Sequence, residues 1–101
     1  MKTIFTQSQI ELMQNALDKW GLNAQVGQAV EECAELIVAL QKHVNRSVKS
    51  GTVESILDEM ADVQMMIAQM RLALEIDDDT FHKRIAEKFA MLEKYIENDE
   101  C

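Results

Sequence analysis

The sequence predicts an all-α fold, and three features of its composition and patterning support that prediction. The 101 residues include no proline and only three glycines, whereas the strong helix formers Ala, Leu, Met, Glu, Lys and Gln are abundant. Hydrophobic residues make up 48% and charged residues 28% of the chain, which is typical of a folded globular domain. Apolar residues repeat at helical spacing in four segments. We therefore expect residues 1–101 to form one domain, built as a four-helix antiparallel bundle.

The first helix is expected from Gln7 to Trp20. Thr6 and Gln9 fit a capping box, in which the Thr hydroxyl and the Gln amide satisfy free N–H groups at the start of the helix. Gly21 supplies a stop signal at its end.

The second helix is expected to begin near Asn23 or Ala24 and to end near Val44. Its principal apolar stripe consists of Val26, Val30, Cys33, Ile37, Leu40 and Val44. Because other sides of this helix also carry apolar residues, we expect it to pack on two sides, the second against another subunit.

The third helix is expected after Thr52, a suitable N-cap, and runs to about Leu74. The fourth is expected from about Phe81 to Ile96. Its N-cap is one of three candidates: Asp78, Asp79 or Thr80.

The charge and the termini exclude several classes of protein. A net charge of −8, without a basic stripe in the first three quarters of the chain, argues against direct nucleic-acid binding. No apolar run approaches the roughly 20 residues needed to span a bilayer, and the N-terminal segment turns polar too early for a signal peptide. Cys33 and Cys101 are typical of free thiols. We expect a cytoplasmic protein.

Two acidic pairs stand out on the second and third helices. Glu59 projects within the apolar face of the third helix and Asp62 lies at its edge, where a carboxylate is costly unless a proton, a cation or a metal compensates it. Glu31, Glu32 and Glu35 crowd one stretch of the second helix, for which a solvated acidic face is the alternative interpretation. No basic residue occurs between residues 19 and 42 or between residues 49 and 71.

If these two helices are antiparallel neighbours, four carboxylates converge, because residues three apart project in the same direction from adjacent turns. The pairs are Glu32 with Glu35, and Glu59 with Asp62. Convergent oxygen ligands without a nearby lysine suit Mg²⁺, with Mn²⁺ as the alternative.

The two half-motifs, "EECAE" at 31–35 and "EMAD" at 59–62, resemble those of the MazG-like nucleoside triphosphate pyrophosphohydrolases. The similarity covers roughly residues 24–97. It implies Mg²⁺-dependent hydrolysis of a (deoxy)nucleoside triphosphate to the monophosphate and pyrophosphate, by a dimer or a dimer of dimers (a tetramer). The resemblance makes Glu32, Glu35, Glu59 and Asp62 metal ligands. It also gives Glu31, beside Glu35, a catalytic role in binding a second metal or orienting the attacking water.

The resemblance also implies substrate-binding residues outside the acidic pairs. Lys88 matches the phosphate-binding lysine of the family's last helix, with Lys83 and Arg84 as further candidates, but the asparagine expected near it is absent. Trp20 is placed to stack on a base, although a core or interface tryptophan is equally consistent. Gln28, with Gln25, is a candidate for reading a base edge, although solvated glutamines are commoner. Met66 is a candidate floor of a base pocket.

Two other functions are consistent with the same sequence. One keeps the superfamily but narrows the substrate to dUTP or a damaged nucleotide. The other is a non-enzymatic helical dimerisation module, whose acidic face binds a basic partner or solubilises the protein.

Overall fold

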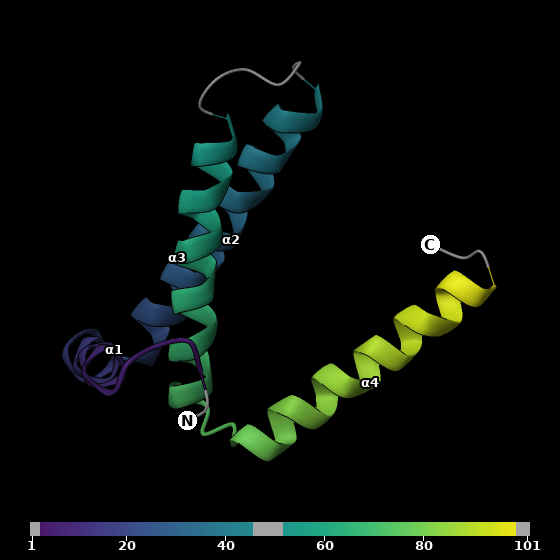
Figure 1. Ribbon diagram of the computed structural model, residues 1–101. Helices are drawn as coiled ribbons and strands as arrows, with labels where there is room; N and C mark the ends of the chain where they lie inside the picture. The colour runs from purple at the N-terminus through teal and green to yellow at the C-terminus, as the bar shows by residue number, and fades with distance from the viewer. Residues whose placement is uncertain (1–2, 46–51, 99–101) are drawn as a thin grey trace.

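The computed structural model describes residues 3–45 and 52–98, which form four helices and no strand (Figure 1). The helices are α1 (Gln7–Trp20), α2 (Leu22–Asn45), α3 (Thr52–Ala73) and α4 (Asp78–Glu97). The all-α prediction is therefore confirmed. Over these two ranges, no helix combines the length and the apolar character needed to cross a bilayer.

Both ends of α1 form as the sequence predicts. The Thr6 hydroxyl accepts a hydrogen bond from the Gln9 backbone N–H at 3.2 Å, and the Thr6 N–H donates to Gln9 Oε1 at 2.8 Å. At the other end Gly21 adopts a φ of 86°, a conformation that favours glycine, and its N–H donates to the Leu17 carbonyl. Local sequence therefore fixes the length of this helix.

The predicted cap of α4 is wrong by one residue. Asp77, in extended conformation, accepts a 2.7 Å hydrogen bond from the Thr80 N–H, so the three candidates from Asp78 to Thr80 lie inside the first turn. A carboxylate three residues before a free N–H is the geometry that an N-cap needs. The preceding helix, α3, ends at Ala73. Glu75, just beyond it, has a φ of 54°, and the Ile76 N–H donates to the Arg71 carbonyl, as in a Schellman motif.

A hairpin of α2 and α3 forms the centre of the molecule, and α1 packs across the end at which α2 begins and α3 finishes (Figure 1). The core that these three helices form is small. Its buried apolar residues are Met13, Leu17, Ala39, Met66 and Ala68.

The principal apolar stripe expected for α2 does not enter this core. All six of its residues are exposed, and we call them the α2 stripe: Val26, Val30, Cys33, Ile37, Leu40 and Val44. The buried side of α2 instead carries Gln25 and Ala39, with Glu32 half-buried. The apolar stripe thus remains a surface of the single chain.

Helix α4 does not join the other three helices, so one chain does not form the predicted four-helix bundle. Arg71 near the end of α3 holds the start of α4, because its guanidinium pairs with Asp78 at 2.7 Å and lies 4.2 Å from the Phe81 ring centre. Beyond Phe81 every described residue of α4 is exposed, and the helix extends away from the hairpin (Figure 1). The chain is therefore a three-helix unit with a projecting fourth helix.

Candidate metal centre

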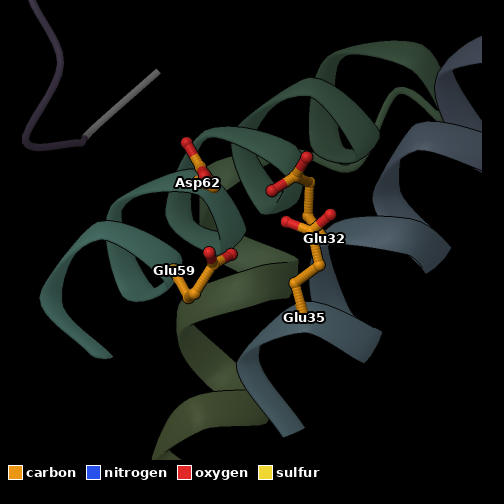
Figure 2. A group of neighbouring side chains, drawn as sticks. All are labelled: Glu32, Glu35, Glu59 and Asp62. Atoms are coloured by element: carbon orange, nitrogen blue, oxygen red, sulfur yellow. The ribbon is translucent and has the colours of Figure 1, made fainter. Parts of the chain in front are cut away.

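Four carboxylates converge between α2 and α3 (Figure 2). Each of Glu32, Glu35, Glu59 and Asp62 contributes a ligand oxygen, and these four atoms all lie within 4.8 Å of one another. We call this group the carboxylate cluster. The convergence expected from the sequence is present, and it arises because two i,i+3 pairs face each other across antiparallel helices.

The electrostatics of the carboxylate cluster are unfavourable without a cation. Burial raises the pKa of Glu32 above its usual value of 4.5, and the neighbouring Asp62 and Glu35 carboxyl groups add to the rise, although a 2.7 Å hydrogen bond from Gln28 Nε2 opposes it. Burial also raises the pKa of Glu59, and the charge of Glu35 reinforces the effect. Close negative charges disfavour ionisation of one another.

Two oxygens of the carboxylate cluster lack any hydrogen-bond partner. Glu32 Oε2 and Glu59 Oε2 are shielded from solvent and accept no hydrogen bond. Unpartnered oxygens of half-buried carboxylates, drawn together on two rigid helices, match the donor set of a hard divalent cation such as Mg²⁺ or Mn²⁺. The residues present therefore fit the metal that the resemblance implies.

A cavity of about 620 Å³ lies on the α1 side of the carboxylate cluster, and we call it the α1 cavity. It is lined by three of the residues that the sequence predicts to bind substrate, namely Trp20, Gln28 and Met66. Trp20 is 59% exposed and is not a core residue of the chain. Gln28 links the two features, because it lines the α1 cavity and also donates to Glu32.

Two buried glutamines also line the α1 cavity: Gln25, which the sequence offered with Gln28 as a candidate for reading a base edge, and Gln69, which was not assigned from the sequence. Gln25 is 6% exposed and Gln69 is 4% exposed, and both line the cavity wall. The expectation of a solvated side chain is therefore wrong for Gln25. The sequence alone does not identify Gln69, because a polar residue on a helix is expected to be exposed unless its packing neighbours are known.

A second cavity, of about 320 Å³, adjoins the other side of the carboxylate cluster, and we call it the Lys42 cavity. Glu31, Glu35 and Glu59 line it together with Lys42 and Ser55. Glu31 thus lies beside the cluster without being one of its four converging members. Lys42 follows Glu35 by two helical turns, a spacing that places both on one side of α2.

The basic residues of α4 are not brought to the carboxylate cluster. Lys83, Arg84 and Lys88 lie on the exposed projecting helix (Figure 1), and Arg84 makes an ion pair with Glu87 of the same helix. The physical reason is the corner at Arg71, which directs α4 away from the hairpin. Lys42 of α2, in contrast, shares a cavity with Glu35 and Glu59 of the cluster.

Comparisons with family models, with curated proteins and with solved structures returned no match to this chain. The resemblance to the MazG-like pyrophosphohydrolases therefore remains a prediction from the two half-motifs.

Proposed function

We propose that this protein is a Mg²⁺-dependent nucleoside triphosphate pyrophosphohydrolase that releases pyrophosphate from a (deoxy)nucleoside triphosphate in nucleotide-pool control or house-cleaning. The observation that carries the proposal is the carboxylate cluster, whose four oxygens come from two helices and lie within 4.8 Å of one another. Glu32, Glu35, Glu59 and Asp62 would hold the ion. When bound, Mg²⁺ lowers the pKa of a coordinated water and neutralises charge on the phosphates.

In this proposal the substrate lies along the hairpin, between the two cavities. Along α2 the order is Gln28, Glu32, Glu35, Lys42, and α3 runs antiparallel beside it. A base in the α1 cavity places the phosphates over the carboxylate cluster, with the terminal phosphates toward Lys42. Glu31, which lines the Lys42 cavity, would orient water, and most of the catalysis would be positioning and electrostatics.

The activity test is to incubate the pure protein with each NTP and dNTP in the presence of Mg²⁺. We expect pyrophosphate rather than orthophosphate as the product. Glu35→Gln and Asp62→Asn should lower the rate at least about 100-fold, the loss typical when a group that stabilises transition-state charge is removed. Asp58→Asn is the matched control, because Asp58 is an exposed carboxylate of α3 outside both cavities. Hydrolysis of none of the nucleotides, or equal rates in all variants, would refute the proposal.

A second candidate is a non-enzymatic helical dimerisation module, and the exposed α2 stripe favours it. The two functions differ in their response to metal. A ligand that binds only the folded state stabilises it by about 2.7 kcal/mol at 100 times its Kd, so an enzyme should melt at a higher temperature with Mg²⁺. A melting temperature that is unchanged by Mg²⁺ would favour the module.

A further inference from the structure

Gln69 is a buried polar side chain that the packing of the chain does not explain. It is 4% exposed, and its Oε1 atom is shielded from solvent and accepts no hydrogen bond. Such unsatisfied buried polar atoms are rare in folded proteins and call for a reason. Gln69 lines the α1 cavity, so this unsatisfied carboxamide belongs to the wall against which a bound molecule would lie.

A second carboxamide reaches the same cavity from the neighbouring helix. Gln25 of α2 is 6% exposed and lines the cavity wall, which elsewhere is mainly apolar, with Leu12, Met13 and Met65 among its residues. A carboxamide presents a donor and an acceptor side by side. That arrangement matches the adjacent donor and acceptor on the edge of a nucleobase.

The size and the aromatic wall of the α1 cavity fit the same ligand. A volume of about 620 Å³ lies within the range of small-molecule sites, and the Trp20 ring offers a flat apolar surface on which a base can stack. Gln69 follows Asp62 by seven residues, or about 10 Å along the helix. This separation leaves room for a sugar between a base at Gln69 and phosphates at the carboxylate cluster.

We propose that Gln69, assisted by Gln25, determines which nucleobase the α1 cavity accepts. A half-turn about the last side-chain bond of Gln69, a torsion with a broad energy profile, exchanges the positions of Oε1 and Nε2, so the carboxamide can accept from an N–H group of the base or donate to one of its acceptors. The inference rests on the proposed function only in taking a nucleotide as the ligand.

The single tryptophan of the chain allows binding to be measured without hydrolysis. Titration with each nucleoside monophosphate, in EDTA, should quench Trp20 fluorescence saturably and rank the bases. In Gln69→Met the preferred base should bind about tenfold more weakly, which is the effect of losing one net hydrogen bond. The differences in affinity among the bases should therefore become smaller. Gln64→Met, at an exposed position of the same helix outside the cavity, should behave as wild type.

The outcomes separate this inference from the proposed function. A folded Gln69→Met variant that keeps the wild-type ranking overturns the inference, as does the absence of quenching by every monophosphate in a protein that hydrolyses triphosphates. A ranking that depends on Gln69 in a protein without hydrolase activity supports the base site and refutes the enzyme. If Gln69→Met does not fold, Gln25→Met must flatten the ranking, and its failure to do so overturns the inference.

Discussion

At the scale of single residues, the carboxylate cluster and the α4 cap respond to pH with opposite signs. The pKa of Glu32 and of Glu59 is raised in the folded state, so above about pH 4.5 the folded chain holds more protons than the unfolded chain and stability falls as the pH rises. Hydrogen bonds from the Thr80 backbone and hydroxyl groups lower the pKa of Asp77. The stabilisation that Asp77 contributes to the folded state is present above pH 3.8, the usual pKa of an Asp side chain, and is lost as the pH falls below that value.

Without metal, the protein should therefore become more stable as the pH falls through the raised pKa of Glu32 and of Glu59 toward their usual value of 4.5. Glu59→Gln removes one of the unpartnered charges, so it should raise the metal-free melting temperature at neutral pH and reduce this pH dependence. Melting curves in EDTA at several pH values measure both effects. Asp58→Asn serves as the control and should leave the pH dependence unchanged. A metal-free Glu59→Gln protein that melts below wild type at neutral pH would contradict the electrostatic interpretation.

At the scale of helices, the corner between α3 and α4 depends on one buried cation. The Arg71 side chain is 7% exposed and its partner Asp78 is 27% exposed, whereas the Arg84–Glu87 pair on α4 is largely solvated. Removing one partner of a buried charged hydrogen bond leaves the other group without compensation, but solvated pairs contribute little.

Arg71→Met should therefore lower the free energy of unfolding by about 1–3 kcal/mol, because it breaks a charged hydrogen bond and the contact with Phe81. The matched Arg84→Met change should cost less than about 0.5 kcal/mol. Urea denaturation of the two variants measures the difference. Equal losses in the two variants would show that the corner does not depend on the buried guanidinium.

The ends of α1 and the acidic pairs could be predicted because their causes are local. The capping box at Thr6 and the stop at Gly21 depend on residues within one turn, and the two acidic pairs depend only on helical periodicity. The orientation of α2 could not be predicted in this way, because it has apolar residues on more than one side and the choice between them depends on packing partners. The direction of α4 depends on a contact between Arg71 and Phe81 that no periodicity indicates.

At the scale of the whole molecule, the single chain is too open for its mass. Its radius of gyration is 16.3 Å, against about 13 Å for a compact domain of this length. Its accessible surface is 7815 Å², against about 5,800 Å² for a monomer of this mass. The excess is comparable to the area that one subunit buries in a stable dimer. The α2 stripe and the apolar residues of α4 are the surfaces available for that contact.

We therefore expect a homo-oligomer that buries the α2 stripe. Ile37 is 61% exposed near the middle of the stripe, and Ile37→Glu should dissociate the assembly because an unpaired charge in an apolar contact is costly. Sedimentation velocity over a range of concentrations measures the change. Asn15→Glu adds the same charge at an exposed position of α1 and should leave the assembly intact.

Cys33 provides a second measurement of the same contact, because it belongs to the α2 stripe and is exposed in the single chain. We expect alkylation of Cys33 to be slower in the wild-type protein than in Ile37→Glu. A wild-type protein that sediments as a monomer at every concentration would refute the oligomer.

The pairing of two i,i+3 motifs across a helical hairpin also determines which insertions the carboxylate cluster can tolerate. One residue added inside α2, between Glu32 and Glu35, rotates one carboxylate by about 100° relative to the other and removes it from the site. Residues added between positions 45 and 52 leave the angular phase of both helices unchanged. Insertions between the helices should therefore be accepted far more readily than insertions within them. The site is defined by two short sequence motifs and not by the number of residues between them.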